Sequence, residues 1–175
     1  MSYIDMIILC IIKHWKINML KLLYICTHNR CRSILSEAIT NSVGNEKLLA
    51  KSAGSQPVGE VHPLSIKYLS EAGYDTEGLS SESWDDFVEF APDVVITVCD
   101  SAAGEVCPVY FSNAMKIHWG LSDPSKIEGT EDEVAQAFRA CIELIKTRVE
   151  QLSTIANSDL SKHQMTQAIM ALTKE

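Results

Sequence analysis

The segment of the chain with the clearest chemical potential is residues 26–33, CTHNRCRS. It follows the apolar run 22–25 and precedes an amphipathic pattern, so we expect a strand, a tight loop and the start of a helix. Such a loop directs several backbone N–H groups at one point, and the positive end of the helix adds to them, which suits a tetrahedral oxyanion. Arg32 can grip two oxygens of that anion. The same field favours the thiolate of Cys26, which is the form that attacks, and Ser33 can donate a hydrogen bond to it.

The spacing of Cys26, five residues, Arg32 and Ser33 is similar to the signature of the low-molecular-weight tyrosine phosphatase family, which includes a branch of arsenate reductases. The alternative is a buried cysteine beside a surface arginine, but an apolar strand rarely leads into so polar an octet without a ligand to hold. The resemblance covers about residues 20–152. It implies an α/β fold: a flavodoxin-like, doubly wound sheet of four parallel strands with helices on both faces. The expected oxyanion-binding loop consists of Thr27, His28, Asn29, Arg30, Cys31, Arg32 and Ser33.

The composition is that of one globular domain, with 175 residues of which 46% are apolar. The formal net charge of −8 argues against nucleic acid or an anionic membrane as the partner, although a local basic loop can still collect a small oxyanion. The six cysteines lack the even spacing of a disulfide framework. We therefore expect a cytoplasmic protein whose thiols take part in chemistry.

Both ends of the chain lie outside the expected 20–152 domain. Residues 1–19 contain a short apolar run that cannot cross a bilayer, and they lack the features of a signal peptide. We expect 1–19 to be a poorly packed extension translated from an upstream start codon, in which Cys10 has no role; an edge strand or a short helix is the alternative. Residues 153–175 are expected to form a linker and a weakly amphipathic helical tail, to which we assign no role.

Apolar runs alternate with amphipathic stretches along the domain. Strands are expected at 22–25, 48–50, 93–98 and 115–119, and helices at 33–43, 62–73 and 131–152, with a short helix near 84–90. Alternating strands and helices predict βαβ crossovers and a parallel sheet. Gly54, just after the second strand, is expected where a side chain would obstruct the close approach of two backbone segments.

Two further stretches leave the expected sheet at the same edge as the octet. Cys99 ends the third strand and Cys107 lies beyond a loop of small residues, which can move and carry a thiol to a distant partner. Asp123 and Pro124 follow the fourth strand, and the exits of parallel strands lie on one face. Phosphatases of this family carry their general acid on an Asp-Pro loop, and Asp123 matches that position. Alternatively, Asp123 only starts the next turn.

Two activities compete within this scaffold. A tyrosine phosphatase needs Cys26 as the nucleophile, Arg32 as the clamp and Asp123 as the acid. It does not need Cys99 or Cys107. Arsenate reduction needs two electrons, and thiols are the redox groups evident in the chain, so further cysteines near the loop are a chemical requirement of that activity. A non-catalytic thiol module that senses a soft metal is a third hypothesis, but zinc sites need closer cysteine pairs and four ligands.

The resemblance to arsenate reductases implies a relay of thiols for arsenic detoxification. Cys26 attacks arsenate while Asp123 assists the departure of water, and Cys99 then attacks Cys26 and releases arsenite. Cys107 accepts the disulfide, which thioredoxin, or glutathione and glutaredoxin, reduces. The eight-residue step from Cys99 to Cys107 leaves the choice of reductant open. Cys31 is the rival resolving thiol, although its side chain is expected to point away from the anion.

The remaining candidates are structural or ionic. Asn29, Glu37 and Ser52 occupy positions where some reductases of this branch bind potassium, but we predict no required metal and no tightly bound cofactor. Asn29 is expected to brace the loop through its amide. His62 is expected to be a structural residue at the start of a helix, with a catalytic role as the alternative, and Cys141 is expected to fill the core.

Overall fold

The computed structural model describes residues 19–105 and 107–172. The expectations for residues 1–18, including the one for Cys10, lie outside these ranges. Within the described ranges, no helix is both long enough and apolar enough to cross a membrane.

Four parallel strands form one sheet in the order β2-β1-β3-β4. The strands are β1 (Leu20–Cys26), β2 (Leu48–Gly54), β3 (Val94–Thr97) and β4 (Met115–His118). Every residue from Leu22 to Cys26 is buried, as expected for an apolar strand in the middle of a parallel sheet. The predicted four-stranded parallel sheet is therefore confirmed, and its strand order changes direction between β1 and β3.

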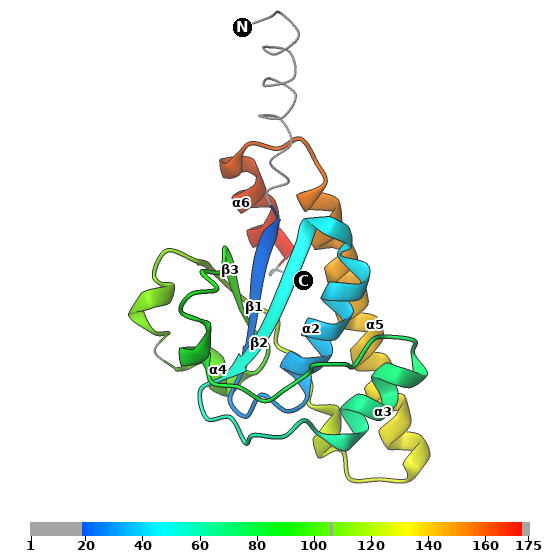
Figure 1. Ribbon diagram of the computed structural model, residues 1–175. Coiled ribbons are helices and arrows are strands. Elements are labelled where there is room, and N and C mark those ends of the chain that lie inside the picture. Colours follow the sequence, from blue (N-terminus) through cyan, green and yellow to red (C-terminus); the bar gives the residue numbers. More distant parts are fainter. Residues whose placement is uncertain (1–18, 106, 173–175) are drawn as a thin grey trace, which may run out of the picture.

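Helices and short turns surround this sheet. The helices of the described residues are α2 (Arg32–Val43), α3 (Pro63–Glu71), α4 (Asp100–Ala103), α5 (Glu131–Ala156) and α6 (Lys162–Ala171). Short 3-10 turns are η1 (Asn45–Lys47), η2 (Trp84–Phe87), η3 (Val109–Phe111) and η4 (Pro124–Lys126). Figure 1 shows α2 and α5 on one side of the sheet and α4 on the other, near the carboxyl end of β1.

The longest helix, α5, packs against α2 through one apolar stripe. The stripe residues recur at three- and four-residue steps and are 2% exposed or less: Phe138, Ile142, Ile145, Val149 and Leu152. Cys141 is also buried in this stripe, which confirms its expected place in the core. The helix continues past its predicted end at residue 152 because Ile155 still packs against the core.

Three elements differ from the prediction. β2 extends to Gly54 because it pairs with β1 along its full length. The segment near 84–90 contains only the η2 turn, which a capping box starts. The small residues after Cys99 form α4 rather than a loop, because the Cys99 sulfur caps the helix by accepting the Ala102 N–H at 3.4 Å.

The carboxyl ends of the strands bring the predicted site segments together. Cys26 ends β1, Cys99 follows β3 and Asp123 follows β4. In open α/β sheets, ligands bind in the crevice outside the strand ends where the strand order changes direction. Here that crevice lies between β1 and β3, where Cys26 and Cys99 leave the sheet.

Candidate active site

The octet forms a loop around the Cys26 sulfur, and Asn29 determines its shape. The Asn29 backbone has a φ of 46°, in the left-handed region that asparagine tolerates better than most residues. Its fully buried amide donates to the Ser33 and Ser52 hydroxyls, both at 2.9 Å, and accepts the Glu82 N–H at 2.7 Å. Asn29 therefore braces the loop through its side chain, as expected.

The Cys26 sulfur is surrounded by donors. It accepts the Asn29 N–H at 3.2 Å and lies 3.0 Å from the Ser33 hydroxyl. Because the Ser33 oxygen already accepts a hydrogen bond from Asn29, its own proton is free to point at the sulfur. Three further loop N–H groups donate to no group in the described part of the chain and remain available to an anion; they belong to His28, Arg30 and Cys31. α2 begins directly after the loop and adds its positive end.

Gly54 allows the loop to lie close to the end of β2. A Cβ at this position would lie 2.7 Å from the Thr27 carbonyl oxygen and 3.0 Å from the Asn29 Cβ, which is too close for an unstrained contact. The Gly54 N–H donates to the Glu82 carbonyl at 2.9 Å, so the backbone cannot easily retreat. The predicted close approach of two backbone segments is confirmed.

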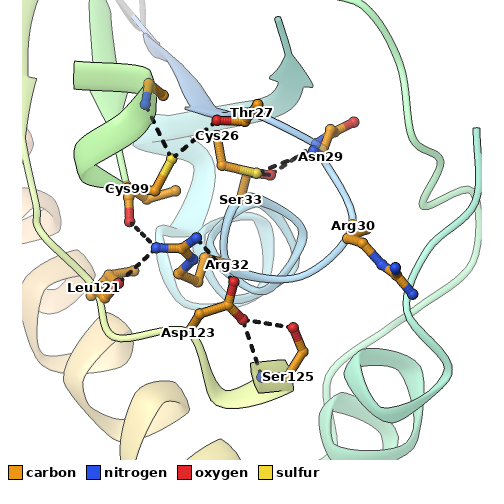
Figure 2. A network of polar contacts seen from close by, with 12 residues as sticks. Cys26, Thr27, Asn29, Arg30, Arg32, Ser33, Cys99, Leu121, Asp123 and Ser125 are labelled. Carbon is orange, nitrogen blue, oxygen red and sulfur yellow. Dashed lines mark hydrogen bonds and ion pairs between the residues drawn. The ribbon is translucent and has the colours of Figure 1, made fainter. Parts of the chain in front are cut away.

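Arg32 and Asp123 face each other at the edge of the loop (Figure 2). The guanidinium Nη2 lies 2.9 Å from Asp123 Oδ2, while Nη1 donates to the carbonyls of Leu121 at 2.9 Å and Val98 at 3.5 Å. The other carboxylate oxygen accepts the N–H and the hydroxyl of Ser125 at 3.1 Å and 2.6 Å. Asp123 is an acceptor in all of these contacts, as an ionised carboxylate must be. A guanidinium has about five N–H donors, so some remain for an anion.

Asp123 has two structural roles in this arrangement. Its side chain caps η4, as in the alternative interpretation, and it also holds Arg32 at the loop. The side chains of Arg32 and Asp123 are only 15% and 16% exposed, so solvent screens this ion pair little. Asp123 is therefore beside the anion site, and its role as a general acid stays a prediction.

Cys99 lies beside the same loop. Its side chain is buried, and its sulfur is 3.8 Å from the Thr27 hydroxyl oxygen. Figure 2 shows the Cys99 sulfur turned toward Thr27 and the end of β1, on the side where Cys26 lies. Cys26 and Cys99 line one pocket of about 370 Å³. The structure thus places both thiols on one pocket, which the predicted relay requires.

The pocket has a cationic lining. Its lining residues are Cys26, Thr27, His28, Arg30, Cys31, Arg32, His62, Cys99, Ser101, Asp123, Ser125 and Lys126. The single carboxylate of this lining, Asp123, is paired with Arg32, so the other charged groups are basic. A chain with a net charge of −8 therefore presents a locally positive opening, which attracts small oxyanions.

Cys107 does not line this pocket. It lines a second one, of about 280 Å³, together with Ala102 and Ala103 of α4. Because α4 also contributes Ser101 to the first pocket, it stands between the two. All described cysteines are free thiols. Cys99 and Cys107 line different pockets.

Cys31 is buried and borders the first pocket, so it does not point wholly away from the anion site as expected. Burial raises the pKa of the Cys31 thiol to about 12, against smaller lowering effects of hydrogen bonds from Ser65 and Ser125. Burial likewise raises the pKa of Cys141 to about 12. A thiol with so high a pKa is a poor nucleophile at neutral pH. This weighs against Cys31 as the rival resolving thiol.

His62 starts α3, as predicted. Its Nδ1 atom accepts the Leu64 N–H at 3.3 Å, and its ring stacks on Phe138 with centroids 6.3 Å apart. Burial, and then the nearby Arg30 charge, lower the His62 pKa. His62 is therefore a helix cap whose ring also borders the pocket.

Asn29, Ser52 and Glu37 form one hydrogen-bonded chain behind the loop. The Asn29 amide donates to Ser52, whose hydroxyl donates to a Glu37 carboxylate oxygen at 2.7 Å. The Lys51 ammonium lies 3.6 Å from the other Glu37 oxygen. Burial raises the pKa of Glu37, while Ser52 and Lys51 lower it. Protein groups thus contact both Glu37 carboxylate oxygens, and the expectation that no metal is required stays a prediction.

Sequence reasoning missed two residues that shape the site. Ser125 holds the Asp123 carboxylate, and its position two residues after an aspartate is a turn-capping pattern that could have revealed it. Lys51 supplies the cation for Glu37 from the neighbouring strand. No local sequence pattern predicts the contact between Lys51 and Glu37, because it depends on the packing of α2 on β2.

Known proteins share this sequence pattern and fold. The family model described as "Low molecular weight phosphotyrosine protein phosphatase" matches residues 21–165. The arsenate reductase of Halalkalibacterium halodurans is 35% identical over 127 residues, which cover 73% of this chain and 90% of that relative. The arsenate reductase of Bacillus subtilis is 30% identical over 130 residues, which cover 74% of this chain and 92% of that relative.

Solved structures agree with these matches. "An arsenate reductase in the phosphate binding state" has a TM-score of 0.65 at 29% identity, with 78% of this chain and 98% of that chain covered. The Corynebacterium glutamicum thioredoxin-dependent arsenate reductase has a TM-score of 0.62 at 28% identity, with 82% of this chain and 65% of that chain covered. The family model covers more than half of the chain, and the chain therefore belongs to the low-molecular-weight phosphotyrosine protein phosphatase family.

Proposed function

We propose that this protein reduces arsenate to arsenite. The observation that carries the proposal is that Cys26 and Cys99 line one pocket, with the Thr27 hydroxyl 3.8 Å from the Cys99 sulfur. A phosphatase does not need the second thiol, whereas reduction needs an electron-pair donor beside the nucleophile. The relatives and solved neighbours named arsenate reductase support the same activity.

Arsenate binds in the loop that surrounds Cys26. Its oxygens accept hydrogen bonds from the free loop N–H groups and from the unused N–H donors of Arg32. The guanidinium of Arg32 can hold two oxygens at once. The Cys26 thiolate attacks arsenic from the centre of the loop, and one arsenate oxygen departs as water. Asp123 is the proposed proton donor for this oxygen, once the bound anion has taken over the donors of Arg32.

The Cys99 thiolate then attacks the Cys26 sulfur. A sulfur–sulfur bond forms and the sulfur–arsenic bond breaks, with its electron pair passing to arsenic. Arsenic changes from the +5 to the +3 state and leaves as arsenite, while the two thiols lose the two electrons as a disulfide. The Ala102 N–H and the Thr27 hydroxyl both lie within hydrogen-bonding range of the Cys99 sulfur.

Cys107 reacts with the Cys26–Cys99 disulfide in the next step. Its thiolate attacks Cys99, the new disulfide forms, and Cys26 leaves as a thiolate ready for another arsenate. Because Cys107 lines the second pocket, α4 must move during this exchange. An external dithiol protein such as thioredoxin then reduces the Cys99–Cys107 disulfide, and the similarity to the thioredoxin-dependent enzyme of Corynebacterium glutamicum supports this choice. The activity would serve arsenic detoxification.

Replacement of single cysteines tests the relay. Cys26→Ser and Cys99→Ser should abolish arsenite production, while Cys107→Ser should release about one arsenite per protein and then stop in the presence of thioredoxin. Cys141→Ala is the matched control, because its thiol lies in the core and should not affect turnover. Multiple turnover by Cys99→Ser would contradict the relay.

A paired assay separates reduction from hydrolysis. The protein is given arsenate with thioredoxin, or an aryl phosphate without any reductant. Arsenite formation that depends on Cys99 supports the proposal. Hydrolysis of the aryl phosphate that is insensitive to Cys99→Ser, together with no arsenite formation, would instead identify a phosphatase.

A further inference from the structure

His118 joins three elements next to the active site. It ends β4, and its Nδ1 atom lies 2.9 Å from the Thr97 hydroxyl oxygen at the end of β3. Its Nε2 atom lies 3.2 Å from Oδ1 of Asp100, the first residue of α4. One imidazole ring therefore tethers the start of α4 to the ends of two strands.

Gly120 leaves the space that this tether needs. A Cβ at Gly120 would lie 3.3 Å from His118 Nε2 and 3.9 Å from Asp100 Oδ1. Any longer side chain would therefore compete with the carboxylate for the imidazole. At Gly120 the chain turns toward Asp123, and the glycine has no side chain that could disturb the contact between His118 and Asp100.

The tether acts on the residue next to Cys99. Asp100 follows Cys99 directly, and the Cys99 sulfur caps α4 by accepting the Ala102 N–H at 3.4 Å. The direction of the thiol thus depends on where α4 starts. His118 contacts Asp100 at that start.

We propose that His118 is a positioning residue that holds Cys99 on the Cys26 side of α4. This inference rests on the proposed thiol relay. In the first exchange Cys99 attacks the Cys26 sulfur, the disulfide forms, and the sulfur–arsenic electron pair passes to arsenic. In the second, Cys107 attacks Cys99, and Cys26 departs as a thiolate.

The tether has opposite effects on the two exchanges. It keeps Cys99 in the first pocket, which favours the attack on Cys26. Cys107 lines the second pocket together with Thr97 and His118. We expect α4 to leave the imidazole before Cys99 meets Cys107. Loss of the tether should slow the first exchange and speed the second.

The exposure of the His118 and Asp100 side chains determines how strongly their contact can change the rates of the two exchanges. The His118 and Asp100 side chains are 40% and 95% exposed, so solvent screens their contact. Exposed pairs of this kind change an equilibrium by about twofold to fivefold. Rates of single exchange steps should therefore change by about twofold to fivefold, in opposite directions.

The first exchange is isolated in a Cys107→Ser background. Protein with or without His118→Phe is mixed with one equivalent of arsenate, quenched with acid, and analysed by mass spectrometry for the Cys26–Cys99 disulfide. We expect this disulfide to form about twofold to fivefold more slowly with His118→Phe. In the protein with all its cysteines, the same quench should show a smaller share of Cys26–Cys99 and a larger share of Cys99–Cys107.

Matched variants separate positioning from folding. Lys67→Ala removes another exposed pair, Lys67–Glu131, which has the same distance of 3.2 Å, and should change neither exchange. Asp100→Ala should reproduce His118→Phe, whereas Asp100→Asn keeps an acceptor for the imidazole and should behave like the parent. If His118→Phe does not fold, Asp100→Ala carries the test, because its side chain is exposed.

Three outcomes would overturn the inference. The two exchanges could slow together, remain unchanged, or respond equally to Lys67→Ala. These results would leave the relay intact. Absence of both arsenite and the Cys26–Cys99 disulfide in the Cys107→Ser parent would instead overturn the proposed function, and the role of His118 with it.

Discussion

Replacing Asn29 with alanine should release the loop while leaving the sheet in place. The change removes three buried hydrogen bonds, to Ser33, Ser52 and the Glu82 N–H, each contributing about 1 kcal/mol. It also places alanine at a φ of 46°, which costs about 1 kcal/mol more than for asparagine. We therefore expect the free energy of unfolding to fall by about 4 kcal/mol.

Urea unfolding and arsenate reduction together measure this effect. Asn29→Gly loses the same hydrogen bonds but tolerates the backbone, so it should be more stable than Asn29→Ala by about 0.5–1 kcal/mol. Asn45→Ala is the control: Asn45 has a φ of 55° and is exposed, so its loss should be about 1 kcal/mol without any change in kcat/KM. The reasoning fails if Asn29→Ala is no less stable than Asn45→Ala, or if its kcat/KM for arsenate is unchanged.

Three further changes probe the surroundings of the loop. Gly54→Ala puts a Cβ 2.7 Å from the Thr27 carbonyl oxygen. In urea unfolding, the free energy of unfolding should therefore fall by about 1–3 kcal/mol. In steady-state kinetics, kcat/KM for arsenate should fall by about tenfold or more, because the loop is displaced. The pKa of Cys31 is raised by burial from 9.0 to about 12, so its stabilising contribution is complete below pH 9 and is lost as the pH rises toward 12. Urea unfolding should show a loss of about 1.4 kcal/mol per pH unit from this group above pH 9, absent in Cys31→Ala. Because Lys51 already pairs with Glu37 at 3.6 Å, exchange of sodium for potassium should change kcat/KM by less than about twofold, and a strong potassium activation would contradict this account.

The site was predictable where its chemistry is local in the sequence. The octet lies between an apolar strand and an amphipathic helix, so its place at a strand end follows from hydrophobic pattern alone. Gly54 was predicted from its position after a strand, and the structure shows the close approach to Thr27 that excludes a side chain. Cys99 and Asp123 were placed at strand exits, and exits of parallel strands share one edge.

Features that depend on packing between distant segments were not predictable. The four residues of α4 are too few to show a helical period, and the contact that caps the helix, from the Ala102 N–H to the Cys99 sulfur, has no sequence pattern of its own. Cys99 and Cys107 line different pockets, which spacing alone could not reveal. The pairing of Arg32 with Asp123 depends in the same way on how the loop after β4 folds back over α2.

In the proposed relay, the place of α4 between the two pockets also bears on how the product leaves. Trivalent arsenic is soft and binds thiolates, most tightly where several sulfurs converge. Residues 19–105 and 107–172 contain no group of three or more cysteine, histidine or acidic side chains placed to hold a metal ion. In the proposed relay, Cys26 and Cys99 are joined in a disulfide when arsenite is released, and Cys107 lines the other pocket. Cys31 is then the one free thiol among the described residues that line this pocket, so in the proposed relay the released arsenite would not meet several converging thiolates.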